Sequence, residues 1–146
     1  MKRIAAFIFA AVLAAPAYAG PYGQALGACL ADNTSGKDRK ELARWIFAAM
    51  SAHPEMKELS SVTPETKEQV FRATGALVTR LLSESCADQA KAAIRAEGAR
   101  SFEQAFGMLG RLAMQELMTN PEVRVAFSGF DRYIDKSKID AALKAR

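Results

Sequence analysis

The two cysteines, Cys29 and Cys86, are the side chains whose chemistry is easiest to name. They follow an N-terminal segment typical of exported proteins, and an even number of cysteines in an exported chain indicates a disulfide. One alternative is lipidation of Cys29, because Leu26-Gly27-Ala28-Cys29 loosely matches a bacterial lipobox. A lipobox should directly follow the apolar run of the signal, however, and lipidation would leave Cys86 unpaired. We therefore predict a bond between Cys29 and Cys86.

The sequence lacks the residue patterns of most catalytic and metal sites. His53 is the single histidine, and it precedes Pro54, where it reads most simply as a capping or surface residue. Zinc sites need several His or Cys ligands at close spacing. The chain also has no Gly-x-Ser-x-Gly elbow, P-loop or dinucleotide fingerprint. We predict no catalytic, cofactor-binding or metal-binding residue. Sixteen acidic residues leave a carboxylate-dependent hydrolase as one alternative.

A set of large apolar residues is the best candidate for a binding surface. These residues come from two consecutive predicted helices: Met108, Met114, Met118, Phe127, Phe130 and Tyr133. Methionine-rich surfaces adapt to apolar or helical partners. Core packing is the simpler explanation. Gly107 and Gly110 interrupt the same region, and we expect them to allow a close helix crossing rather than to touch a ligand.

The element expected to organise the fold is a helix over residues 38–52. Asp38 and Glu41 have the spacing of an N-terminal capping box. Apolar residues then recur with a helical period at Leu42, Trp45, Ile46, Ala49 and Met50. Ala43, Phe47 and Ala48 widen this apolar face until little of the helix is polar. Trp45, the single tryptophan, is predicted to be the core anchor, with the other helices packed around it.

Helix start and stop signals predict the remaining elements. Proline after a capping residue marks starts at Pro64 and Pro121, and Ser101 with Gln104 repeats the capping-box spacing at another start. Residues 87–97 are poor in large apolar groups, so we expect a surface helix there, stopped by Gly98. No stretch has the alternation of a strand. We predict an all-α, compact bundle of about five to seven helices with one disulfide. The further helical segments are residues 22–31, 54–59, 64–83, 87–97, 101–118, 121–134 and a last short helix after Ser137.

The first 19 residues predict a signal peptide. Lys2 and Arg3 precede an apolar run over residues 4–15, which is shorter than a membrane span. Pro16 breaks this run, and Ala17-Tyr18-Ala19 has the small-x-small pattern of a cleavage site. An uncleaved anchor is the alternative. We predict cleavage after Ala19, a single all-helical domain over residues 20–146, and a periplasmic or secreted location.

Charge limits the partners. Removing Lys2 and Arg3 from the 20 basic residues leaves 18, against 16 acidic ones, and the signs are interspersed. A nucleic-acid-binding surface needs clustered basic residues, so we predict no nucleic-acid partner. Stable membrane insertion after cleavage would need a longer apolar segment, so we predict none. The main hypothesis is a small exported module that binds another protein, as an inhibitor, immunity factor, chaperone or adaptor does. The alternatives are a carrier of a small apolar ligand held between helices, and the small hydrolase.

Overall fold

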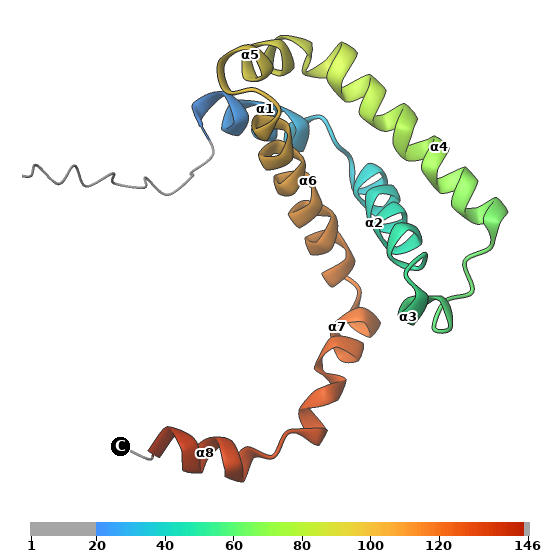
Figure 1. Cartoon of the computed structure of the whole chain (residues 1–146), viewed down its shortest axis with the longest axis vertical. Coiled ribbons are helices and arrows are strands. Elements are labelled where there is room, and N and C mark those ends of the chain that lie inside the picture. The colour runs from blue at the N-terminus through green and yellow to red at the C-terminus, as the bar shows by residue number, and fades with distance from the viewer. Residues whose placement is uncertain (1–19, 145–146) are drawn as a thin grey trace, which may run out of the picture.

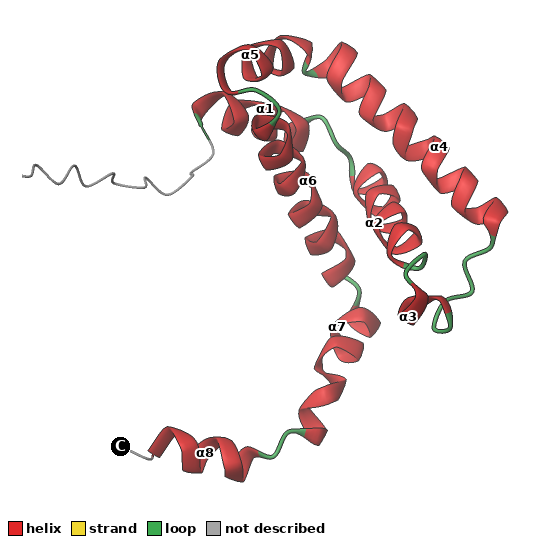
Figure 2. Cartoon of the chain, viewed as in Figure 1, coloured by secondary structure: helices red, strands yellow, loops and turns green. Residues whose placement is uncertain are grey.

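Helices make up all the regular structure of residues 20–144, which the computed structural model describes (Figure 2). The predicted signal peptide lies outside the described residues. The all-α prediction is confirmed. Residues 20–144 contain eight α-helices, more than the predicted five to seven, because each helical segment expected from the sequence forms a separate helix, down to the four residues of α3. The elements are α1 (Pro21–Asp32), α2 (Gly36–Met50), α3 (Pro54–Lys57), α4 (Pro64–Arg80), the π-helical turn η1 (Leu81–Ser85), α5 (Ala87–Glu97), α6 (Arg100–Met118), α7 (Pro121–Ser128), the 3-10 turn η2 (Gly129–Tyr133) and α8 (Lys136–Lys144).

Small residues let α1 and α6 cross closely at the end of the bundle where α5 lies (Figure 1). A Cβ atom built on Gly23 would lie 3.3 Å from Cα of Ser101, and one built on Gly27 would lie 3.5 Å from Cα of Ala105. Ser101 and Ala105 are almost fully buried in the facing helix. The two backbones therefore approach to a distance that larger side chains at these positions would prevent.

Gly107 and Gly110 have no part in this crossing. A Cβ atom on Gly110 would meet nothing within 4 Å, and one on Gly107 would meet only the end of the Arg111 side chain, at 3.9 Å. The prediction of a close crossing at these two glycines is wrong. The crossing lies on the opposite side of α6, where Ser101 and Ala105 face α1.

The core extends from this crossing to α2, α4 and α5. Leu42 and Ala43 of α2 and Leu77 of α4 are buried on one side. The α5 helix, expected on the surface, buries its small residues Ala90 and Ala93 instead. The largest fully buried apolar side chains are Leu26, Leu30, Leu81 and Leu109. The core is thus built on leucine and alanine.

Trp45 is not the centre of the fold. It remains 36% exposed on the outer side of α2 and packs edge-on against Phe71 of α4, with ring centroids 6.5 Å apart. The buried residues of α2 are Leu42, Ala43 and Ala48. Helix α2 is therefore covered on one side, and the prediction of Trp45 as the core anchor is wrong.

Two predicted helix caps are displaced. Helix α2 begins at Gly36, and Ser35 is its N-cap, with Asp38 completing the capping box from position N3. Asp38 is therefore not the cap itself. At the start of α6, Ser101 lies inside the helix, is fully buried, and donates its hydroxyl hydrogen to the Gly98 carbonyl oxygen at 2.6 Å.

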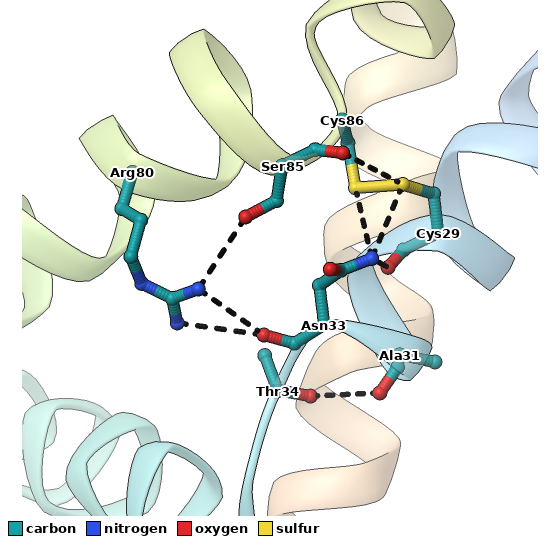
Figure 3. Close-up of a disulfide and its surroundings, with 7 residues drawn as sticks. All are labelled: Cys29, Ala31, Asn33, Thr34, Arg80, Ser85 and Cys86. Carbon is teal, nitrogen blue, oxygen red and sulfur yellow. Dashed lines mark hydrogen bonds between the residues drawn. A yellow bond between two sulfur atoms is a disulfide. The ribbon is translucent and has the colours of Figure 1, made fainter.

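The disulfide between Cys29 and Cys86 joins α1 to the end of η1 (Figure 3). It closes a loop with a sequence separation of 57, and its Cα atoms are 5.9 Å apart. Because Cys29 is bonded to Cys86, the lipidation alternative fails. The Asn33 side-chain amide donates to the Cys29 carbonyl oxygen at 2.9 Å, and Arg80 of α4 donates to the Asn33 carbonyl oxygen at 3.4 Å. The disulfide and Arg80 together fix the corner between α1 and α2.

Residues 121–144 form a C-terminal arm that extends away from the bundle (Figure 1). No residue of α7, η2 or α8 is buried. Asn120 caps α7 as predicted, accepting from the backbone N–H groups of Glu122 and Val123. The compact part of the chain therefore ends at about Asn120, and the prediction of a compact bundle over residues 20–146 is wrong for the arm.

Candidate protein-binding surface

An apolar hollow lies where α2, α6 and α7 meet, and we call it the distal hollow. It encloses about 240 Å³ and is open to solvent. Apolar side chains alone line it: Ala43, Ile46, Phe47, Met50, Met114, Leu117 and Phe127. It lies at the end of the bundle from which the C-terminal arm departs (Figure 1).

A second hollow, the inner hollow, lies between α2, α4 and α6. It measures about 350 Å³ and shares Ala43, Phe47 and Leu117 with the distal hollow. Arg44 is the one charged residue among those that line it. The other lining residues are Ala48, Val62, Thr66 and Val70. Phe47 and Leu117 therefore separate two neighbouring apolar depressions.

Four large apolar side chains around the distal hollow are substantially exposed to solvent. Phe47, Met50 and Phe127 are each 57% exposed, and Met114 is 46% exposed. Single exposed apolar residues are ordinary, whereas a contiguous exposed apolar group is a candidate for an interaction surface. The thioethers of Met50 and Met114 can adapt their shape to a partner.

The structure separates the six residues predicted to form a binding surface. Met114 and Phe127 meet at the distal hollow. Met108 does not belong to it, because its sulfur lies 3.2 Å from the position of a Cβ built on Gly27, at the crossing with α1. Met118 is half-buried at the end of α6. Phe130 and Tyr133 lie beyond α7 in η2 and are largely exposed.

Ile46, Phe47 and Met50 are the members of this surface that sequence reasoning missed. The helical period placed Ile46 and Met50 on the same face as Trp45, which was expected to be buried. The available signal was the breadth of the apolar face of α2, since a helix with so many apolar residues presents some of them to solvent unless it is surrounded.

The polar hollow between α2 and α4 does not resemble an acid–base site. Lys37, Asp38, Glu41 and Arg80 all contribute to its walls. Partial burial raises the pKa of Asp38, but hydrogen bonds from Ser35 and the charge of Arg80 outweigh it, so the pKa lies below its usual value. A carboxylic acid that donates a proton at neutral pH needs a raised pKa.

Metal and histidine chemistry find no support among residues 20–144. The described part of the chain holds no cluster of three or more His, Cys, Asp or Glu side chains suited to a metal ion. His53 caps α3, where its Nδ1 accepts from the Glu55 backbone N–H at 3.3 Å.

No protein-family model, no curated protein and no solved structure matches the chain. Over the described residues, none of the helices has the length and apolar character needed to cross a bilayer.

Proposed function

We propose that this chain is exported, loses residues 1–19, and acts as a non-catalytic module that binds another protein through the distal hollow. The Cys29–Cys86 disulfide is compatible with an oxidising compartment. The N-terminal pattern supplies the export signal and the cleavage site after Ala19.

The observation that carries the proposal is the contiguity of exposed apolar side chains around one depression. Phe47 and Met50 come from α2, Met114 from α6 and Phe127 from α7. A partner helix or loop that inserts one or two large apolar side chains would cover all four at once. Such buried central contacts supply most of the binding free energy in protein interfaces.

The inner hollow favours a second candidate, the carrier of a small apolar ligand. Its volume of about 350 Å³ falls at the lower end of the range for ligand pockets. It is open to solvent, so an apolar ligand would keep part of its surface in water. We rank this function below protein binding for that reason.

The test is site-specific photo-crosslinking in the exporting cell. A photo-reactive phenylalanine analogue at position 127 should yield one discrete protein adduct. Phe47→Ser should reduce the adduct at least ~10-fold, which corresponds to ~1.4 kcal/mol of lost affinity. Leu59→Ser is the matched control, because Leu59 is 80% exposed and lines neither hollow.

Two outcomes would contradict protein binding. An adduct at position 127 no stronger than one at position 72, on an exposed polar part of α4, would mean that the hollow has no protein partner. A small apolar molecule retained by the exported protein, and lost in Phe47→Ser but not in Leu59→Ser, would favour the carrier function instead.

A further inference from the structure

The first turn of α1 is capped by a residue from another helix. Gly20 is the N-cap and has no side chain to offer, and Pro21 has no N–H group. The next two backbone N–H groups, those of Tyr22 and Gly23, each donate to the Glu97 carboxylate at 2.9 Å. Glu97 is the last residue of α5, more than 70 residues away in sequence, and it is half-buried.

The same carboxylate lies against Gly20 itself. A Cβ atom built on Gly20 would be 2.1 Å from Oε1 of Glu97, and even the farther oxygen would be 2.7 Å away. The Gly20 nitrogen is bonded to the same Cα atom, so it lies within about 5 Å of the carboxylate. Position 20 therefore has no room for a side chain without displacing Glu97, while its nitrogen is close to a negative charge.

We propose that Glu97 is a receptor site for the α-ammonium group that cleavage after Ala19 creates at Gly20. Hydrolysis of the Ala19–Gly20 peptide bond adds water: Ala19 leaves with a carboxylate, and the Gly20 nitrogen becomes an ammonium group. Before cleavage this nitrogen is a neutral amide. Afterwards it carries a full positive charge beside Glu97. The inference rests on the proposed cleavage site and is independent of protein binding.

The Glu97 carboxylate would offset the repulsion between a terminal ammonium group and the dipole of α1. The N-terminus of a helix carries partial positive charge, so a bare ammonium group at the start of α1 would be unfavourable. The Glu97 carboxylate reverses this effect, because it attracts the ammonium group and also accepts from the N–H groups of Tyr22 and Gly23. Arg100 lines the same small hollow as Gly20 and Glu97, and is the other charged residue there. Processing therefore adds a charge–charge interaction to the hydrogen bonds that already join α1 to Glu97.

The test is a cycle of four proteins on the mature chain as the cell exports it. Intact mass must first show that this chain begins at Gly20. It is then compared with the same chain acetylated at Gly20, which restores a neutral amide as in the precursor, and both are repeated with Glu97→Gln. Thermal midpoints are measured at low ionic strength.

Acetylation should lower the thermal midpoint of the Glu97 protein by about 2–5 °C, the shift expected for one partly exposed ion pair. In Glu97→Gln it should leave the midpoint unchanged or raise it. Glu68→Gln is the control, because Glu68 pairs with Arg72 on α4 and should leave the acetylation effect intact.

Equal acetylation effects with glutamate and glutamine at position 97 would overturn the proposal and leave Glu97 as a helix cap alone. A mature chain that begins at another residue would also overturn it, through the cleavage site. Neither result would alter crosslinking at the distal hollow, so the two proposals fail separately.

Discussion

Individual glycines in this chain have opposite roles, which depend on what faces them. Gly23 and Gly27 allow α1 to approach α6, whereas Gly110 lies in the middle of α6 with open space beside it. Glycine in a helix is about 1 kcal/mol less favourable than alanine when no packing requires it. The same substitution should therefore have opposite effects at the two sites.

We expect Gly110→Ala to raise the free energy of unfolding by about 0.5–1 kcal/mol. Gly23→Ala should lower it, since its Cβ would lie 3.0 Å from the Gln104 side chain and 3.3 Å from the Ser101 backbone. Urea unfolding of both variants checks the prediction. Stabilisation by Gly23→Ala would show that the α1–α6 crossing can relax.

The sequence could predict which residues of α2 are apolar but not which of them are covered. Trp45 and Phe47 both lie on a broad apolar surface, and local spacing does not distinguish them. Their exposure depends on where α4 and α6 pack, which is set by contacts distant in sequence. For the same reason, the apolar period predicts Ile46 and Met50 in the core, and the sequence identifies only Met114 and Phe127 among the residues that line the distal hollow.

At the scale of elements, helix boundaries were more predictable than helix packing. Thr63 before Pro64 and Asn120 before Pro121 cap their helices through hydrogen bonds within a few residues. Gly98 ends α5 with a φ of 70°, a conformation that glycine adopts readily. These signals are local. At the start of α2, however, Ser35 with Asp38 and Asp38 with Glu41 have the same capping-box spacing, and spacing alone does not show which pair forms the cap.

The capping box of α2 predicts an acid-sensitive contribution to stability. Because hydrogen bonds from Ser35 and the charge of Arg80 hold the pKa of Asp38 in the folded protein below its value in the unfolded chain, the ionised form stabilises the fold above the unfolded pKa. This contribution is lost as the pH falls through the folded pKa. Asp38→Asn should therefore cost about 1 kcal/mol at pH 7 and little at pH 2.

Urea unfolding at both pH values measures this difference. Asp140→Asn, on exposed α8, is the matched control and should behave like the unchanged protein. The pKa of Glu65 and of Asp135 is also lowered, by hydrogen bonds near their own helix starts, so some acid sensitivity should remain in Asp38→Asn. An equal loss of stability at pH 7 and pH 2 would attribute the Asp38 contribution to packing rather than charge.

The whole molecule divides into a cross-linked bundle and an arm. The bundle holds the disulfide and every buried side chain among the described residues. Four apolar residues of the arm are each at least 63% exposed to solvent: Val125, Phe130, Tyr133 and Leu143. Apolar periodicity alone predicted that these helices would pack inward, because it cannot distinguish a face that meets its own chain from one left for another molecule.

Removal of the arm should barely change the stability of the bundle. A chain ending at Thr119 loses no buried residue. Its free energy of unfolding, extrapolated to water from urea unfolding, should therefore stay within about 10–15% of that of the full chain, which is the uncertainty of such extrapolations. Reduction of the Cys29–Cys86 bond provides the contrast, because opening a loop of this length should cost about 2–4 kcal/mol.

Truncation also removes Phe127, so binding at the distal hollow should weaken while the bundle remains folded. A large loss of stability on truncation would mean that the arm packs against the bundle in solution, and its apolar residues would then be core rather than binding surface.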